Sequence, residues 1–544
     1  MSLSRLFPPV PRMRACLLPV SIYLALACRH LALPGIYDDE SLVGHVAQEI
    51  VRIVLSGRLL DLPTGIHPYH GIFSSLACLP LILAFPHAPV AALRLTFVLA
   101  GAATVVLLYR LAYHVVGRWQ EALLAACLLA ISPSFIIGMR IGAYAGGLQL
   151  PIEVASLYCL SLWLESGAGV HLALSMFLLG LGLSCSAQFV FSFAATAVLI
   201  ACHLSIRSPR ERARAILPGL GALFLGAANI IFHVGVGFRH FESFLRQRIA
   251  AEGSFFQPIE WSFQLARFRD LADGSAFPGR ISEYRGAPDL GPRNPFFPWI
   301  VVAALFFLAL SAVARRRDER EFPKALREGD LLAWQAVYFL TSGTFRFARL
   351  PIHIFAWLPL PQLCVALALS RWKPRAPRRS RAFFLAAAAL LGANLFADAA
   401  CLAGFDGYLA RTGGQDRFSS AVYDLVAWLE AGRAEKVLVF SRPLQNNLWY
   451  LSRGRIDAVA SYYPTGADAP RARRIGREAV AGRRRVDLVE YVIRQPGEDA
   501  SAAVFLDEAA ALGYSCAERR FADRESTPVF TAWRCAPRAL ASAR

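Results

Sequence analysis

The chain has 544 residues, of which 56% are hydrophobic and 18% are charged, and its mean hydropathy is +0.43. This composition excludes an ordinary soluble protein, because apolar runs long enough to cross a hydrocarbon core of about 30 Å recur before residue 404. The formal net charge of +18 does not indicate nucleic-acid binding. Many arginines fall in short loops between the apolar runs, where positive charge sets topology, and no nucleic-acid-binding module is recognisable.

The first apolar run predicts a retained signal anchor. Arg5, Arg12 and Arg14 precede the run 15–33, and no small-residue cleavage site follows it. We therefore expect the N-terminus in the cytoplasm and residues 34–90 on the outer side of the membrane.

This first outer segment has the most informative residues of the chain. Residues 37–40 (YDDE) stand where the first span leaves the membrane, and residues 67–70 (HPYH) precede the apolar stretch 71–85. The stretch 42–55 predicts an interfacial helix, and 71–85 is too short for a full span. Three consecutive carboxylates at a membrane boundary are costly unless water, a cation or a substrate meets them. The two clusters together suggest a site for an anionic, lipid-borne substrate.

The sequence predicts about eleven membrane spans in total. Every strongly basic short loop falls on one side under this count, as the positive-inside rule requires; these loops are 207–214, 315–317 and 371–381. After the first span, the expected spans are 93–116, 122–139, 150–164, two within 171–206 with a break near 184–188, 215–236, 297–314, 331–345, 352–369 and 382–402.

After residue 403 the pattern changes to alternating strands and helices, which predicts a small α/β domain over residues 404–544. Expected helices are 421–429, 444–451 and 503–512, and expected strands are 436–440, 456–460, 488–493 and 528–535. Most of the 11 cysteines lie inside apolar spans, so no disulfide scaffold is expected. Cys516 and Cys535 are exceptions in a polar region, and a disulfide and two buried thiols are both open.

The carboxylates and histidines of the first outer segment are the leading candidates for chemistry. Asp39 and Glu40 suit a general base or a metal ligand, because several acids at one boundary are otherwise costly. His67 and His70 suit binding of a phosphate or a metal. The plainer alternative for the acids is a solvated loop at a span exit.

A second group of candidates lies at other outer boundaries. Arg140, Arg346 and Arg349 are guanidiniums that suit phosphate oxygens, although arginines also anchor span ends. Glu153 lies just inside the fourth span, where an acid is a functional candidate, and its expected partner is Arg140. Two further candidates lie in the outer loops around 140–149 and 346–353: Tyr144 and His353.

These residues are arranged as in a known class of enzymes. The chain resembles GT-C glycosyltransferases, and within them it is similar to the dolichyl-phosphate-mannose–protein mannosyltransferase family and its bacterial relatives that attach aminoarabinose to lipid A. The resemblance covers about residues 14–400 and rests on Asp39-Glu40, residues 67–70, residues 94–136 and residues 346–361. Tyr69 stands where the family has a second proline. The family's second outer acid is absent from 140–149, and Glu153 is the nearest carboxylate.

The resemblance implies a polytopic α-helical membrane protein whose residues 1–403 form the GT-C-like transferase. The count of eleven spans places the α/β domain, residues 404–544, on the extracytoplasmic side of the inner membrane. The resemblance also implies an inverting transfer in which Asp39 takes a proton from the acceptor while polyprenyl phosphate leaves. Donor phosphate would be bound by His67, His70, Arg140, Arg346 and Arg349. A divalent cation held by Asp39, Glu40 and His67 stays open, because 140–149 has no carboxylate.

The implied partners are a polyprenyl-phosphate sugar, the lipid bilayer and an acceptor glycan, lipid or protein, with no nucleic acid. Two alternatives stay open. A lipid or sugar transporter would show inverted repeats and charges near the bilayer midplane, and neither is clear in the sequence. A non-catalytic subunit of an envelope glycan system would keep the fold without the chemistry.

Overall fold

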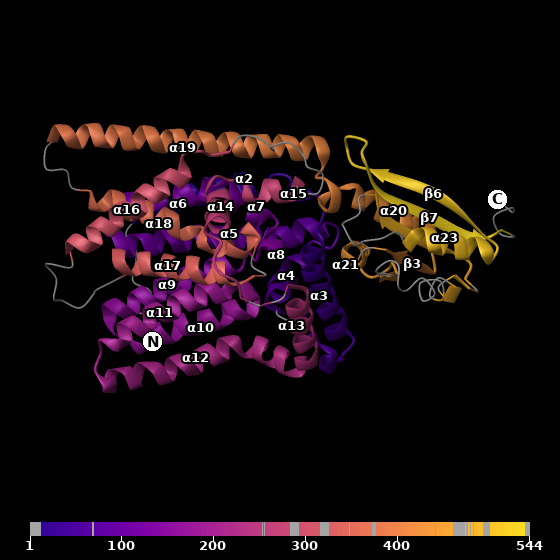
Figure 1. Cartoon of the computed structure of the whole chain (residues 1–544), viewed down its shortest axis with the longest axis horizontal. Coiled ribbons are helices and arrows are strands. Elements are labelled where there is room, and N and C mark those ends of the chain that lie inside the picture. Colours follow the sequence, from indigo (N-terminus) through magenta and orange to yellow (C-terminus); the bar gives the residue numbers. More distant parts are fainter. Residues whose placement is uncertain are drawn as a thin grey trace.

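The structure is a computed structural model of the whole chain. It describes residues 12–67, 70–252, 254, 256–282, 293–315, 326–346, 349–372, 377–440, 442–460, 474, 477–478, 480–481, 483–492 and 501–538. Figure 1 shows a body of packed helices and, beyond one end of it, a smaller region with a sheet that contains the C-terminus. We call these the helical body (residues 12–412) and the C-terminal region (residues 413–538).

The helical body contains nearly all of the helices. They are η1 (Met13–Cys16), α2 (Leu17–Ala27), α3 (Asp38–Leu55), η2 (Leu59–Asp61), α4 (Phe73–Ala84), α5 (Pro89–Val116), α6 (Trp119–Ile131), α7 (Pro133–Arg140), α8 (Gly142–Ala145), α9 (Gln149–Ser166), α10 (Gly169–Cys185), η3 (Ala187–Phe189), α11 (Val190–Ser205), α12 (Pro209–Val236), α13 (Phe238–Glu252), α14 (Trp261–Ala272), α15 (Ala276–Ser282), α16 (Phe297–Arg315), α17 (Glu328–Thr344), η5 (Pro351–Trp357), α18 (Pro359–Arg371) and α19 (Pro377–Thr412).

Several of these helices are long and apolar enough to cross a membrane. Among the described residues five helices qualify alone, and seven spans result if two bent pairs each count once. The bent pairs are α6 with α7, at 57°, and η5 with α18, at 42°. Pro133 and Pro359 begin the second helix of each pair, where proline is tolerated although it interrupts a continuous helix. The protein therefore is a membrane protein by composition and length, and the count of eleven spans stays a prediction.

Three shorter apolar helices and the outer segment explain part of the difference in the count. The predicted span 15–33 and the first of the two spans predicted within 171–206 correspond to Met13–Ala27 and Gly169–Cys185, which are shorter than a full span. The expected break near 184–188 is present between α10 and α11. The predicted interfacial helix 42–55 is the second part of α3, which begins earlier, at Asp38.

A small hairpin follows α3 and lies against α12. Strands β1 (Gly65–His67) and β2 (His70–Gly71) pair antiparallel. Asn229 of α12 donates from Nδ2 to the carbonyl of Thr64 (3.0 Å) and accepts from the N–H of Ile72 (3.0 Å). These two bonds fix the hairpin to the helix from both of its ends. Pro68 and Tyr69 lie outside the described residues.

The C-terminal region is built on a five-stranded sheet of order β4-β3-β5-β7-β6. Strand β3 pairs parallel with β4 and β5, whereas β7 pairs antiparallel with β5 and β6. The elements are η6 (Asp416–Phe418), α20 (Ala421–Gly432), β3 (Lys436–Val439), α21 (Arg442–Leu451), β4 (Ala458–Ala460), β5 (Val486–Tyr491), α23 (Ser501–Ala511), β6 (Tyr514–Ala522) and β7 (Pro528–Pro537). All seven expected elements are present, and β6 was not expected. Its middle, Glu518–Arg519–Arg520, is polar on both faces, so it lacks the alternation that identifies a strand.

The two cysteines whose pairing the sequence did not decide form a disulfide. Cys516 of β6 and Cys535 of β7 stand opposite each other in register and form a disulfide. It closes the outer edge of the sheet, since β6 is an edge strand.

The two parts of the chain share one core. A single cluster of buried apolar side chains includes Val43 and Leu93 of the helical body together with Leu448 and Tyr450 of the C-terminal region. Helix α19 also continues past residue 403, the expected boundary, to Thr412. The C-terminal region therefore is packed onto the helical body rather than tethered to it.

Candidate functional site

The acidic residues singled out in the sequence form the first turn of α3. Asp38, Asp39 and Glu40 are its first three residues, and the helix is entered from Tyr37 in an extended conformation. Carboxylates are favoured there, because the unpaired N–H groups at the start of a helix form the positive end of its dipole. Asp38 and Asp39 are half-buried, whereas Glu40 is completely buried. The acids therefore lie on an ordered helix end and not in a solvated loop.

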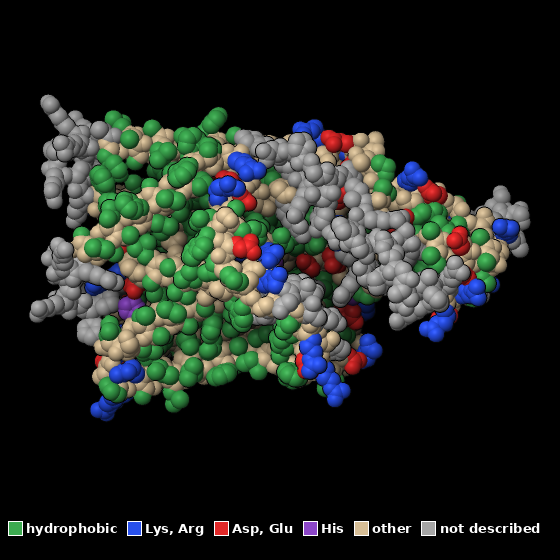
Figure 2. Space-filling model, viewed as in Figure 1, with side chains coloured by type: hydrophobic (Ala, Val, Ile, Leu, Met, Phe, Trp, Pro, Cys, Tyr) green, Lys and Arg blue, Asp and Glu red, His purple; other side chains and the backbone are tan. Residues whose placement is uncertain are grey.

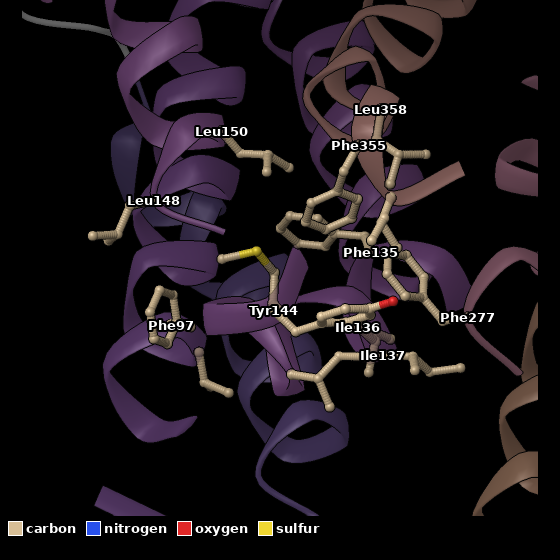
Figure 3. Close-up of a cluster of buried hydrophobic side chains, with 14 of the residues drawn as sticks. Phe97, Phe135, Ile136, Ile137, Tyr144, Leu148, Leu150, Phe277, Phe355 and Leu358 are labelled. Carbon is tan, nitrogen blue, oxygen red and sulfur yellow. The ribbon is translucent and has the colours of Figure 1, made fainter. Parts of the chain in front are cut away.

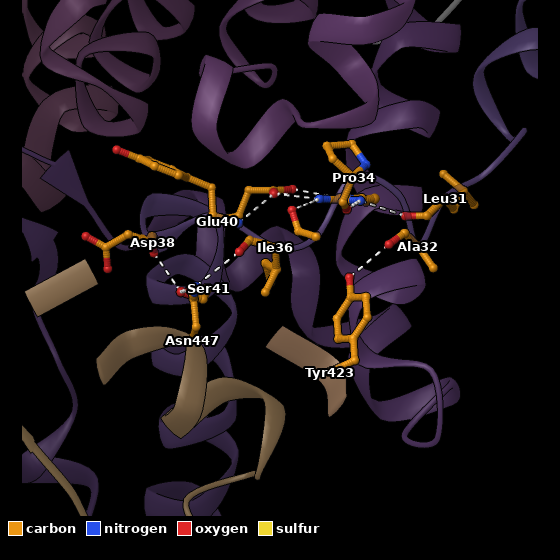
Figure 4. Close-up of polar contacts among 12 residues, drawn as sticks. Leu31, Ala32, Pro34, Ile36, Asp38, Glu40, Ser41, Tyr423 and Asn447 are labelled. Atoms are coloured by element: carbon orange, nitrogen blue, oxygen red, sulfur yellow. Dashed lines mark hydrogen bonds and ion pairs between the residues drawn. The ribbon is translucent and has the colours of Figure 1, made fainter. Parts of the chain in front are cut away.

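Glu40 is bound by a buried arginine of α5. Arg94 donates from Nε to Glu40 Oε1 (2.9 Å) and from Nη2 to Oε2 (2.8 Å), and both side chains are 0% exposed. Its Nη1 also donates to the carbonyls of Leu31 (3.0 Å) and Pro34 (2.8 Å), as Figure 4 shows around Glu40. A bidentate, buried pair of this kind fixes geometry. Glu40 therefore holds the entry to α3 in place, and Asp39 is the neighbouring carboxylate with more exposure.

An aromatic cluster adjoins the acidic turn. The ring of Tyr37 stacks on Phe418 of the C-terminal region (4.7 Å) and meets Tyr144 of α8 edge-on (4.8 Å). Figure 3 shows Tyr144 among buried apolar side chains that also include Phe277 and Phe355. The structure thus brings the predicted candidate Tyr144 next to the predicted acids, with an apolar wall behind it.

A buried arginine that the sequence analysis did not single out lies in α14. Arg267 is 4% exposed, and its Nε and Nη2 have no hydrogen-bond partner. It forms no ion pair within the described part of the chain, where its guanidinium lies near the ring of Phe263 (5.8 Å). Burial lowers the pKa of Arg267 to about 10, so the group is still charged at neutral pH. An uncompensated buried cation is costly, which indicates an anionic ligand.

Packing connects Arg267 to the same end of the body. The next residue, Phe268, meets Trp357 of η5 edge-on (4.7 Å), and η5 in turn packs against α8 and α9. Gln264, one turn earlier, donates to Ser342 Oγ (2.7 Å) and to the carbonyl of Phe339 (2.7 Å). Gln264, Arg267, Phe268 and Leu271 are all buried and recur at helical spacing. That spacing was the available signal for a cation on the buried face of an amphipathic helix.

Arg140 is buried and paired, in contrast to the boundary position that the sequence suggested. Its Nη1 donates to Asp406 Oδ1 (3.0 Å) and its Nη2 to the carbonyl of Leu26 (3.0 Å), and the residue is 1% exposed. Arg29 also contacts Asp406 Oδ2 (3.5 Å). The expected partner, Glu153, was therefore wrong. Asp406 is 266 residues from Arg140 in sequence, so no local pattern indicated this pair.

Glu153 lies in a different environment. Its Oε2 accepts from Ser192 Oγ of α11 (2.5 Å), and its Oε1 accepts no hydrogen bond from the described residues. The side chain lies in the second turn of α9 and is completely buried. Glu153 therefore forms no ion pair with Arg140, whose carboxylate partner is Asp406.

The remaining predicted phosphate ligands fall into two places. His70 belongs to strand β2 of the hairpin, and its Nε2 is hydrogen-bonded to Ser186 Oγ (3.1 Å). The side chain of His67 lies outside the described part. Arg349 is exposed and donates to Gln257 Oε1 (3.0 Å), and Arg346 is half-buried. The chain around Gln257 leads into α14, so Arg349 contacts the segment that precedes Arg267. His353 Nδ1 accepts from the N–H of Leu350 (3.2 Å) and caps η5.

A metal site built from Asp39, Glu40 and His67 does not fit the contacts of Glu40. Both of its carboxylate oxygens are taken by Arg94, so neither is available without breaking that pair. Within the described ranges no group of three or more His, Cys, Asp or Glu side chains is close enough to hold a metal ion.

Figure 2 shows how charge is distributed over one face of the molecule. Hydrophobic side chains cover most of the helical body, and acidic side chains gather where the body meets the C-terminal region. The site described above thus lies at the polar end of a largely apolar body.

Comparison with known proteins gives the same class as the sequence. Residues 78–232 match the family model described as dolichyl-phosphate-mannose-protein mannosyltransferase. The fold is similar to ArnT from Cupriavidus metallidurans bound to undecaprenyl phosphate, with a TM-score of 0.60, 13% identity and coverage of 95% of this chain and 97% of that chain. No curated protein matches the sequence.

Two further solved structures share the fold. The oligosaccharyltransferase AglB from Archaeoglobus fulgidus, in complex with an inhibitory peptide and a dolichol-phosphate, matches with a TM-score of 0.53, 12% identity and coverage of 93% and 72% of the two chains. The oligosaccharyltransferase from the same organism in complex with Zn and sulfate matches with a TM-score of 0.52, 13% identity and coverage of 88% and 68%. The resemblance expected from the sequence is confirmed at the level of the fold: the chain shares the fold of these GT-C transferases, and its residues 78–232 match the mannosyltransferase family model.

Proposed function

We propose that the protein transfers a sugar from a polyprenyl-phosphate donor to an acceptor hydroxyl or amine, with inversion, on the extracytoplasmic side of the inner membrane. The proposal rests on two observations: the acidic first turn of α3 at Asp39, and the buried guanidinium of Arg267, whose Nε and Nη2 have no hydrogen-bond partner among the described residues. It is supported by the fold shared with a protein that binds undecaprenyl phosphate and another that binds dolichol-phosphate.

Asp39 is the general base of this mechanism. Its carboxylate takes the proton of the acceptor O–H or N–H while the acceptor atom attacks the anomeric carbon of the sugar. The bond from that carbon to the phosphate oxygen breaks in the same displacement, and polyprenyl phosphate leaves with the electron pair. Glu40 does not take the proton, because Arg94 occupies both of its oxygens.

Arg267 receives the negative charge that develops on the departing phosphate. A guanidinium in a water-poor environment stabilises such a charge more strongly than one in water, and no rearrangement is needed if it is already held in place. The packing of Phe268 on Trp357 provides that support. Arg346 and Arg349 we assign to the approach of the phosphate, since Arg349 is bonded to the segment leading into α14. His70, Arg140 and Glu153 we assign to supporting the site, because each has a partner outside the acidic turn.

The C-terminal region faces the extracytoplasmic side in this proposal. The disulfide between Cys516 and Cys535 supports it, because disulfides persist in oxidising compartments and are rare in the cytoplasm. The domain assignment follows: residues 1–403 provide the transferase and residues 404–544 cover its outer end, next to an acceptor glycan, lipid or protein.

The test is release of polyprenyl phosphate by the purified protein from a panel of polyprenyl-phosphate sugars with an acceptor mixture. We expect turnover of one donor class, and loss of about 10²- to 10⁴-fold in Asp39→Asn, the usual contribution of a general base. Asp61→Asn is the matched control, since Asp61 is an exposed acid of the same outer segment that contacts only Arg58 (3.6 Å) among the described residues. Turnover by Asp39→Asn at the rate of the control would refute the assignment, and wild-type protein inactive on every donor would refute the proposed function.

A further inference from the structure

One helix of the C-terminal region lies along the helix that has the acidic turn. Helix α21 packs against α3, and the contact runs from the first turn of α3 to its last. Asn447 and Asn446 meet the first turn, and Arg453, just after α21, receives a bond from Arg52 Nη2 at its carbonyl (3.3 Å).

Asn447 bridges the two ends of the acidic turn. Its Nδ2 donates to the carbonyl of Ile36 (3.1 Å), and its Oδ1 accepts from Ser41 Oγ (2.7 Å), as Figure 4 shows. Asn447 is 1% exposed and Ser41 is 0% exposed. One buried amide therefore binds the residue before the turn and the residue after it, and Asp39 lies between these two points. Buried hydrogen bonds of this kind define a single arrangement, because the unmade state is costly.

The neighbouring amide binds an acid directly. Asn446 donates from Nδ2 to Asp38 Oδ1. Asp38 directly precedes Asp39 on the helix, so this bond ties the residue next to Asp39 to α21.

The segment before the acidic turn, residues 31–34, is hydrogen-bonded by both the helical body and the C-terminal region. Arg94 of the helical body binds the carbonyls of Leu31 and Pro34, and Tyr423 of α20 donates to the carbonyl of Ala32 (2.8 Å). The entry to α3 is thus enclosed between the body and the C-terminal region, with bonds from each.

The rest of the contact leaves little room for sliding. A Cβ at Gly44 would lie 2.4 Å from the ring of Tyr450, so only glycine allows this approach. Tyr450 also donates from its hydroxyl to the carbonyl of Pro89 (2.7 Å), and His45 stacks on Trp449 (5.1 Å). Close packing along the whole helix pair is what makes the amide contacts at its end precise in position.

We propose that the C-terminal region completes the transfer site, with Asn446 and Asn447 as positioning residues that set the orientation of Asp39. The inference rests on the proposed function for the role of Asp39, but the positional part is independent of it. A cover that only shielded the site would not need a buried amide that is bonded on both sides of the acidic turn, as Asn447 is. The region therefore contributes to the rate of transfer and not only to stability.

The test compares Asn447→Leu with Gln445→Leu on the same helix. Gln445 donates to the carbonyl of Ala458 (2.9 Å) inside the C-terminal region, so its loss removes a bond of α21 that does not reach α3. We expect kcat of Asn447→Leu to fall about 10- to 100-fold, as for a small misplacement of a reacting group, with the donor KM within about twofold of wild type. Gln445→Leu is expected to keep the wild-type kcat.

A second pair of variants separates positioning from folding. Ser41→Ala removes the same hydrogen bond from the side of α3. The loss of kcat in the double variant Ser41→Ala/Asn447→Leu should be smaller than the product of the two single losses, because both changes break one interaction. If Asn447→Leu does not fold, Asn446→Ala, at a half-buried position, takes its place. Folded variants at position 446 or 447 with kcat within about twofold of wild type would overturn the proposal.

Hydrogen exchange makes the inference distinguishable from the proposed function. Amides of residues 36–41 should exchange faster in Asn447→Leu than in Gln445→Leu, whether or not a donor has been found. Unchanged exchange would overturn the positioning role. Wild-type protein without turnover, together with faster exchange in the variant, would overturn the proposed function and leave the contact itself confirmed.

Discussion

Replacement of Arg94 by methionine should destabilise the protein strongly. The change removes both bonds to Glu40 and leaves a carboxylate that is 0% exposed without its counter-ion. Breaking a buried ion pair on one side costs about 3–5 kcal/mol, and each buried carbonyl left without a donor adds about 1–3 kcal/mol. Because the carbonyls of Leu31 and Pro34 also lose Arg94, we expect a loss of about 5 kcal/mol or more, against a typical net stability of about 5–15 kcal/mol.

The assay is thermal unfolding in detergent, followed by tryptophan fluorescence, for Arg94→Met, for Glu40→Met and for the double variant. The double variant should recover part of the loss, since an apolar pair of similar volume often replaces a buried ion pair at little cost. Arg58→Met is the control, because its pair with Asp61 is exposed and exposed pairs contribute about 0–1 kcal/mol. An unfolding midpoint of Arg94→Met equal to that of the control would refute the structural role given to the Glu40–Arg94 pair.

Three further predictions concern other parts of the molecule. Arg267→Met should weaken binding of polyprenyl phosphate about 10-fold or more in a detergent-based binding assay, whereas Arg269→Met, exposed on the same helix and paired with Asp270, should bind as wild type; equal affinities would contradict the phosphate assignment. Burial lowers the pKa of His45, with Glu49 opposing the shift and Arg52 adding to it, so the unfolded state binds the proton first as the pH falls. The stability is therefore retained above about pH 6.5 and is lost as the pH falls below it. His45→Phe should flatten the pH dependence of the unfolding midpoint between about pH 7 and 5. Alkylation of the unfolded, unreduced protein should modify nine cysteines and not all eleven, and Cys516→Ala with Cys535→Ala should cost about 2–4 kcal/mol of stability; eleven modified cysteines in membrane-extracted protein would contradict the disulfide.

Local pattern was sufficient for most elements of the fold. The strands and helices after residue 420 could be predicted from alternating and helical periodicity, and the amphipathic stretch at 42–55 is a helix. Strand β6 could not be predicted in this way, because its middle, with Arg519 and Arg520, is polar on both faces and lacks the alternation of a half-buried strand. The span count was the weakest point, because hydropathy alone does not show that Met13–Ala27 and Gly169–Cys185 are helices shorter than a full span.

The site was predictable by residue type but not by partner. The acidic turn and Tyr144 were found, and they lie together. The partners of Glu40 and Arg140 are Arg94 and Asp406, which are 54 and 266 residues away in sequence, and a long-range pair of this kind leaves no local pattern. Arg267 lies between the predicted spans 215–236 and 297–314, and its place on the buried face of a helix could have been predicted from the spacing of its apolar neighbours. The contact between α21 and α3 depends on how the two regions pack, which no sequence window contains.

A single-turnover measurement with bound donor tests the central claim most directly. Wild-type protein and Asp39→Asn are each saturated with the polyprenyl-phosphate sugar that the panel identifies, acceptor is added, and released polyprenyl phosphate is followed in time. We expect both proteins to bind the donor equally well, and Asp39→Asn to release product about 10²- to 10⁴-fold more slowly. Equal rates of release from the two proteins would contradict a base at Asp39, and with it the transfer mechanism proposed for this site.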